Sequence, residues 1–141
     1  MALHAALPGE AERHETVGER RSRLILALVM AGAGALHFVI PDAYVPLIPR
    51  RLGDARLIVY LSGVVEATAG VLLAATRTRR IGGWLTAAVL VAIFPGNVQM
   101  AINGGRPGAT GPLASSTVAW LRLPLQVPLI VWALRQARRH R

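Results

Sequence analysis

The sequence predicts an all-α integral membrane protein, a four-helix bundle with antiparallel neighbours and both termini in the cytoplasm. Hydrophobic residues make up 53% of the 141-residue chain, and a helix of about 20 apolar residues can cross the hydrocarbon core of a bilayer. The apolar residues gather into four long runs, at 24–40, 57–75, 81–101 and 113–134. A soluble protein of this length would have too little remaining surface to cover four such helices.

The distribution of arginine predicts the orientation. All 16 basic residues are arginine, a bias that favours a bacterial source with a GC-rich genome. The N-terminal side, the 77–80 link and the C-terminal tail hold four, three and four arginines, eleven in all, against four in the other two loops. Because cytoplasmic segments carry the excess of positive charge, we expect a multi-pass protein of the bacterial cytoplasmic (inner) membrane, with the lipid bilayer as partner. The arginines flank apolar spans, so the net charge of +9 does not indicate nucleic-acid binding.

Three segments make up the chain: a polar cytoplasmic tail at 1–22, a transmembrane domain at 23–134 and a basic cytoplasmic tail at 135–141. The first tail either forms a surface helix from about Glu10 or has no regular structure. The stretch "RRSRLILALVMAGAGA" is similar to a signal peptide. The long acidic tail before it and the apolar residues after it predict that it is retained as the first span.

Prolines and glycines mark the connections between the spans. The loop "PDAYVPLIPRRLGD" carries prolines at 41, 46 and 49, a spacing that excludes a regular helix and predicts a structured loop at the outer interface. The link "TRTRR" is so short that the second and third spans must form an antiparallel hairpin. "NGGRPGATGP" predicts a flexible turn, and Pro95 predicts a kink in the third span. The fourth span contains Pro124 and Pro128.

A few polar residues interrupt the apolar runs. Glu66 lies in the middle of the second span, and Arg122 lies at a similar depth in the fourth. Burying either charge alone is costly, so we expect the two side chains to form a salt bridge. Gln126, one helical turn from Arg122, or Asn97 in the third span would complete the hydrogen bonds of the pair.

The same residues predict a polar pocket that opens outward. His37 and Asn97 lie near the outer ends of their spans and Tyr44 lies in the interfacial loop, so we expect these three to converge at the pocket mouth. The candidate pocket residues are His37, Tyr44, Glu66, Asn97, Arg122 and Gln126. A buried ion pair can instead serve only to fix helix register, and both interpretations stay open. No metal site is expected, because His37 and Glu66 are two candidate ligands without a metal-binding spacing and the chain has no cysteine.

Four fragments resemble, in order, the four helices of the DoxX-like family of small bacterial membrane proteins: "GALHFVIPDAYVPLIP", "SGVVEATAGVLLAATRTRR", "FPGNVQMAI" and "LRLPLQVPLIVWAL". The resemblance covers residues 24–134 and includes His37, Glu66, Asn97 and Arg122. It implies a four-helix bundle and no single agreed chemistry. Relatives are linked to quinol oxidase, thiosulfate oxidation or redox-stress complexes, distant animal relatives resemble receptor-assembly chaperones, and similar four- and five-helix proteins bind or isomerise sterols. None of these activities follows from the fold alone.

Two functions of different classes remain open. The first is an accessory or binding protein whose pocket takes a lipophilic small molecule such as a quinone, or the transmembrane segment of a partner such as a membrane oxidoreductase complex. The second is a membrane enzyme, an isomerase or a quinone-linked oxidoreductase component, with Glu66 or His37 as proton donor or acceptor. A small transporter or channel is a third class and would need an oligomer. The sequence identifies neither a catalytic residue nor a cofactor.

Overall fold

The first helix begins earlier than its apolar run. The computed structural model describes residues 15–105, 111 and 114–138, and α1 covers Val17–Val39. Thr16 caps this helix: its hydroxyl accepts a hydrogen bond from the backbone N–H of Glu19 at 3.2 Å, and the Glu19 carboxylate accepts one from the N–H of Thr16 at 2.9 Å. This reciprocal capping box satisfies two of the N–H groups that a helix start leaves unpaired, so α1 can start before the chain becomes apolar. Residues 1–14, including the suggested helix start at Glu10, lie outside the described residues.

Three short 3-10 helices follow α1: η1 (Pro41–Ala43), η2 (Val45–Leu47) and η3 (Arg50–Leu52). This confirms that the proline spacing excludes a regular helix, because each proline removes a backbone donor. Asp54 then starts the second helix by accepting hydrogen bonds from the backbone N–H groups of Arg56 at 2.9 Å and Leu57 at 3.1 Å.

The remaining helices are α2 (Ala55–Ala74), α3 (Arg79–Ile102) and α4 (Ser116–Arg138). All four helices are long and apolar enough to cross a membrane, which confirms the predicted four-helix membrane fold. The helical structure of α3 continues through Pro95. Within the described ranges there is no β-strand, only an isolated bridge between Gly105 and Ser115.

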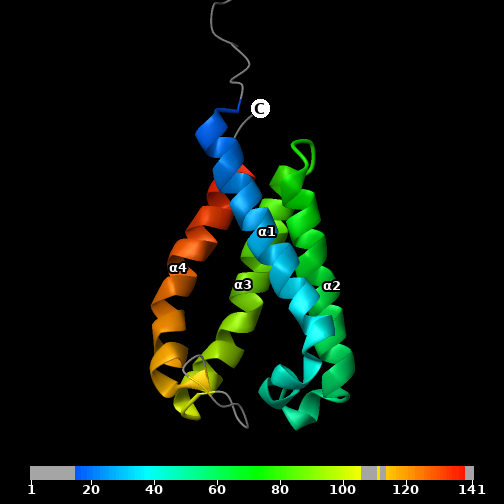
Figure 1. Ribbon diagram of the computed structural model, residues 1–141, viewed down its shortest axis with the longest axis vertical. Helices are drawn as coiled ribbons and strands as arrows, with labels where there is room; N and C mark the ends of the chain where they lie inside the picture. Colours follow the sequence, from blue (N-terminus) through cyan, green and yellow to red (C-terminus); the bar gives the residue numbers. More distant parts are fainter. Residues whose placement is uncertain (1–14, 106–110, 112–113, 139–141) are drawn as a thin grey trace, which may run out of the picture.

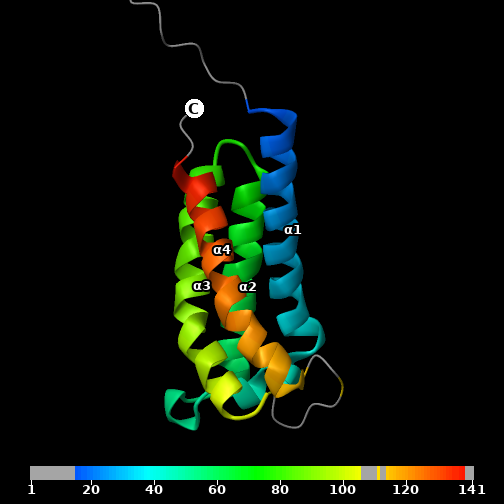
Figure 2. The ribbon, with the colours of Figure 1, turned by 90° about the vertical axis from the view of Figure 1, so that its left-hand side faces the viewer.

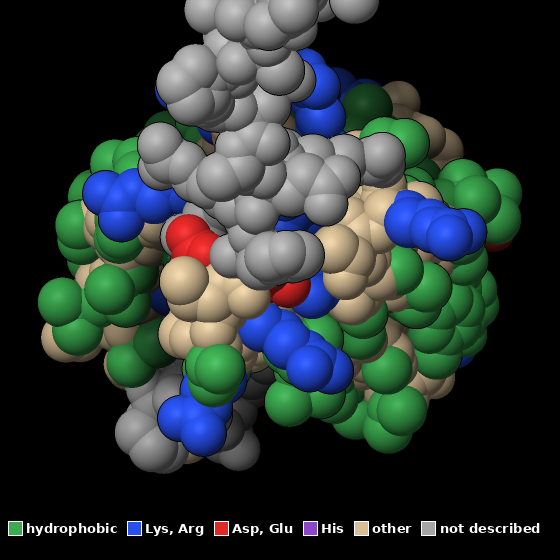
Figure 3. Space-filling model, turned by 90° about the horizontal axis from the view of Figure 1, so that it is seen from above, with side chains coloured by type: hydrophobic (Ala, Val, Ile, Leu, Met, Phe, Trp, Pro, Cys, Tyr) green, Lys and Arg blue, Asp and Glu red, His purple; other side chains and the backbone are tan. Residues whose placement is uncertain are grey.

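The helices form two antiparallel hairpins. In the first, α1 packs along α2; in the second, α3 packs along α4; and α2 contacts α3 between them (Figures 1 and 2). The start of α1, the 75–78 link and the end of α4 lie together at what we term the terminal end, and η1–η3 lie at the opposite, loop end (Figure 1). Seen from the terminal end, arginine side chains are distributed around the bundle and hydrophobic side chains cover its flanks (Figure 3).

Small residues let the helices approach closely. Gly83 of α3 lies so near α4 that an added Cβ would be 2.6 Å from the backbone nitrogen of Ala137. Close backbone contact of this kind replaces the hydrophobic effect as the driving force between helices in lipid. The main core cluster consists of Leu26, Ala27, Met30, Ala69, Leu73, Ala87, Leu90 and Ala133. Large apolar side chains such as Leu28 and Val71 point outward, as expected for helices that face lipid.

Candidate functional site

His37 and Glu66 are the two buried titratable groups that face each other near the loop end. Their residues are 7% and 6% exposed, and Nε2 of His37 lies 3.8 Å from Oε1 of Glu66. The sequence places them together through Gly63, one turn before Glu66 on α2. A Cβ at Gly63 would be 2.7 Å from Cβ of His37, so only glycine lets α1 come close enough to bring the imidazole over the carboxyl group.

The second ring nitrogen of His37 determines how the pair can exchange a proton. Nδ1 lies 2.8 Å from the backbone carbonyl oxygen of Ala33. A carbonyl oxygen only accepts, so Nδ1 donates and Nε2 is the nitrogen that faces Glu66. Nε2 is then an acceptor in the neutral ring and a donor in the charged ring. The pair can therefore hold one proton on either the imidazole or the carboxyl group.

Tyr44 completes this group, which we term the His37 cluster (His37, Tyr44 and Glu66). The rings of Tyr44 and His37 stack with centroids 4.0 Å apart and planes 19° apart. Tyr44 lies between η1 and η2, so the proline-bearing loop positions it against the end of α1. The stack covers one face of the imidazole and restricts its rotation. This confirms the expected meeting of His37 and Tyr44.

Asn97 and Gln126 form a separate polar group between α3 and α4. The side-chain amide of Asn97 donates to Oε1 of Gln126 at 2.9 Å, and the amide of Gln126 donates to the backbone carbonyl of Leu90. Pro95 has no N–H and leaves the carbonyl of Val91, the neighbour of Leu90, without its helical donor. Gln126 therefore anchors α4 to α3 one residue before the carbonyl that Pro95 leaves unpaired.

The predicted salt bridge between Glu66 and Arg122 is wrong, and so is the prediction that Gln126 or Asn97 completes it. Glu66 pairs with His37, Gln126 pairs with Asn97, and none of the described carboxylates forms an ion pair with Arg122, which is half-buried. The physical reason is the direction that each side chain faces. Glu66 lies on the face of α2 that packs on α1, whereas α4 packs mainly on α3. Equal depth therefore does not bring the two groups together.

The six candidate pocket residues thus fall into two groups and one separate residue. His37, Tyr44 and Glu66 meet in the first hairpin, and Asn97 and Gln126 meet in the second. Among the described residues, Asn97 makes its side-chain hydrogen bond to Gln126, and no hydrogen bond or ion pair joins it to the His37 cluster. The expected single mouth formed by three elements is replaced by two polar groups, one for each hairpin.

A third polar group, at the terminal end, was not anticipated. Arg23 is 2% exposed; it binds both carboxylate oxygens of Glu15, at 2.8 and 2.9 Å, and its Nη1 donates to the backbone carbonyls of Leu73, at 2.7 Å, and Ala74. The same Glu15 carboxylate lies 3.6 Å from Arg79 at the start of α3. The signal was present in the sequence, because position 23 continues the buried stripe of α1, three residues before Leu26.

The comparisons with known proteins are consistent with a single domain that spans the four helices. No curated protein and no solved structure gives a match to the chain. Residues 26–137, from the first buried leucine of α1 to the last turn of α4, match the family described as Domain of unknown function (DUF8561). The match includes α2, α3 and most of α1 and α4, and every member of the three polar groups except Glu15 and Arg23. The chain therefore belongs to the DUF8561 family.

Proposed function

We propose that the protein binds a lipophilic molecule that carries a carbonyl or hydroxyl group, such as a quinone, with its polar group at the His37 cluster. The observation that carries the proposal is the geometry of the His37–Glu66 pair. The 3.8 Å between Nε2 and Oε1 exceeds the 3.2 Å limit of an N–H···O hydrogen bond. Both atoms therefore keep hydrogen-bonding capacity that they do not spend on each other.

The Glu66 carboxyl group has further unused capacity. None of the described residues donates a hydrogen bond to it, although the residue is 6% exposed. Ionisable residues inside membranes are functional by default. A ligand oxygen placed between Glu66 and His37 would satisfy both groups. The stacked ring of Tyr44 would lie beside it at the loop end, where a lipophilic molecule has its polar head.

The role we favour is an accessory or binding role in the bacterial inner membrane, within a membrane oxidoreductase complex or beside another membrane protein. The resemblance to DoxX-like proteins supports it, and we propose the DUF8561 and DoxX-like families to be related. A partner's transmembrane segment is the other candidate occupant of the site.

A membrane enzyme is the second candidate, and one observation favours it. The bond from Nδ1 to Ala33 leaves only Nε2 to take or give a proton, and the Glu66 carboxyl group lies 3.8 Å from that nitrogen, where a ligand atom can bridge the two. This is the arrangement that a proton donor and acceptor needs for an isomerisation, or for protonating a reduced quinone. Mass analysis of the lipophilic molecule after incubation separates the two roles, because an isomerase changes it and a binding protein returns it unchanged.

Binding can be measured with purified protein in lipid nanodiscs and a short-chain quinone as the probe. Glu66→Gln keeps the shape of the side chain and removes the carboxylate, and should weaken binding about tenfold or more, the loss of one charge-assisted hydrogen bond. Thr68→Ala, two residues away on the exposed side of α2, is the matched control and should bind as the wild type does. Equal affinity of Glu66→Gln and Thr68→Ala would show that the cluster is structural.

The orientation is part of the proposal: both termini in the cytoplasm and η1–η3 outside. The chain has no cysteine, so single cysteines can be introduced without background. Leu52→Cys in η3 should react with a membrane-impermeant maleimide in cells with a permeable outer membrane. Thr76→Cys in the link between α2 and α3 should react only after the inner membrane is opened. The reverse labelling pattern would show the opposite orientation, with both termini outside.

A further inference from the structure

We infer that a groove on α4 at the terminal end is a binding site for an anionic phospholipid. The groove has a volume of about 380 Å³ and is lined by Val131, Leu134, Arg135 and Arg138; we term it the α4 groove. Its lining is apolar toward the middle of the helix and basic toward the helix end. That order matches a phospholipid, whose acyl chains enter the membrane and whose phosphate stays at the surface.

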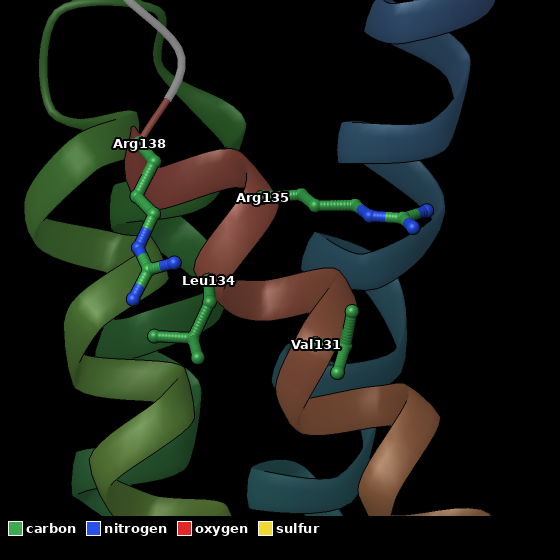
Figure 4. Close-up of a pocket in the computed structure, with 4 residues that line it drawn as sticks. All are labelled: Val131, Leu134, Arg135 and Arg138. Carbon is green, nitrogen blue, oxygen red and sulfur yellow. The ribbon is translucent and has the colours of Figure 1, made fainter.

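The two guanidinium groups frame the groove. They extend to opposite sides of α4, Arg138 over α3 and Arg135 on the side of α1, with Leu134 and Val131 between them (Figure 4). None of the described carboxylates forms an ion pair with either arginine. A guanidinium group presents a fork of N–H donors that matches phosphate oxygens. The described residues therefore do not neutralise the charge of the groove, and an anion from outside them would.

One of the arginines is already oriented by an aromatic side chain. The guanidinium carbon of Arg138 lies 6.0 Å from the ring centre of Trp84 on α3, at the outer limit of a cation–π contact. The contact uses the face of the guanidinium group and leaves its N–H edges available. Trp84 is 47% exposed, and tryptophan is enriched at the level of the lipid headgroups, which places the groove at the membrane surface.

Helix dipoles do not change the sign of the electrostatic potential at the α4 groove. The end of α4 contributes about half a negative charge, and the nearby start of α3 contributes about half a positive charge, so the two offset each other. The two arginines then leave the local field positive. On the apolar side, Val127 lies one turn before Val131 and is 60% exposed, so the lining continues along α4 as an exposed stripe on which an acyl chain can lie.

The test compares two double variants with the same change in charge. Arg135→Gln with Arg138→Gln removes the basic side of the groove, and Arg50→Gln with Arg51→Gln removes two exposed arginines from η3 at the loop end. Delipidated protein is titrated with phosphatidylglycerol or phosphatidylcholine in detergent and examined by native mass spectrometry. The wild type should bind phosphatidylglycerol more tightly. The groove variant should lose about fivefold in affinity for each arginine, near 25-fold in total, and the η3 variant should bind as the wild type does.

A second variant tests the shape of the site without changing its charge. Val131→Trp fills the groove and should weaken phosphatidylglycerol binding while leaving both arginines in place. Inorganic phosphate at millimolar concentration should not displace the lipid, because it has no acyl chain to place on the apolar stripe. The inference is overturned if the two double variants lose affinity equally, if phosphatidylcholine binds as tightly as phosphatidylglycerol, or if Val131→Trp has no effect.

Discussion

Replacing Arg23 by methionine should destabilise the bundle by about 3–4 kcal/mol. The substitution removes the two bonds to Glu15, at 2.8 and 2.9 Å, and the donors to the carbonyls of Leu73 and Ala74 at the end of α2. Breaking a buried pair by removing one partner costs about 3–5 kcal/mol. The lower part of that range applies because Arg79 remains 3.6 Å from the Glu15 carboxylate and still compensates its charge.

The measurement is the free energy of unfolding in mixed micelles of detergent and SDS, followed by circular dichroism. Arg21→Met is the matched control, because Arg21 is exposed two residues away and its loss should stay within about 0.5 kcal/mol. Arg23→Lys keeps the charge but cannot bind both carboxylate oxygens in one plane, so its loss should fall between the two. If Arg23→Met and Arg21→Met unfold at the same SDS fraction, the terminal-end group contributes nothing to stability and the reasoning fails.

Two further predictions concern the first hairpin. Gly63→Ala should destabilise the protein by about 1–3 kcal/mol, because the added Cβ would lie 2.7 Å from Cβ of His37. Gly32→Ala is the control: an added Cβ there has nothing within 4 Å, so the change should be neutral or stabilising by up to about 1 kcal/mol. The same SDS titration compares the two variants, and equal effects would contradict the close approach of α1 and α2 at Gly63. Double-mutant cycles can be built from the free energy of unfolding in the same titration. Glu66→Gln and His37→Phe should show a coupling energy of at least about 0.5 kcal/mol, whereas the effects of Glu66→Gln and Arg122→Met should be additive within about 0.5 kcal/mol. A larger coupling to Arg122 would restore the salt bridge that the structure lacks.

The number and extent of the helices could be predicted from the sequence, because hydropathy and bilayer thickness determine both. The apolar run 57–75 became α2 at Ala55–Ala74, and 81–101 became α3 at Arg79–Ile102. The apolar run at 24–40 predicts a later start for the first helix than the observed Val17, because hydropathy does not detect a polar first turn. A threonine at 16 followed by a glutamate at 19 is the sequence pattern of a capping box, and it identifies the true start.

The partner of Glu66 could not be found from depth alone. Position along the chain gives the height of a residue in the membrane, but the direction that its side chain faces depends on which helices touch. Depth favoured Arg122, at the height of Glu66, over His37, near the outer end of its span. Gly63, on the same face of α2, carried the missing information, because the neighbouring helix of a hairpin is the nearest candidate for a close approach. The same rule would have directed Gln126 of α4 toward Asn97 of α3.

The confinement of the His37–Glu66 pair to the first hairpin has a consequence for biosynthesis. A membrane chain is inserted from its N-terminal end while the ribosome is still working. Glu66 enters the bilayer directly after the helix that carries His37, so its partner is present before α3 and α4 have been made. With a partner on α4, the carboxyl group would have stayed unpaired until Arg122 was synthesised, 56 positions later in the chain. The insertion machinery can therefore release α1 and α2 as a pair in which Glu66 already faces His37.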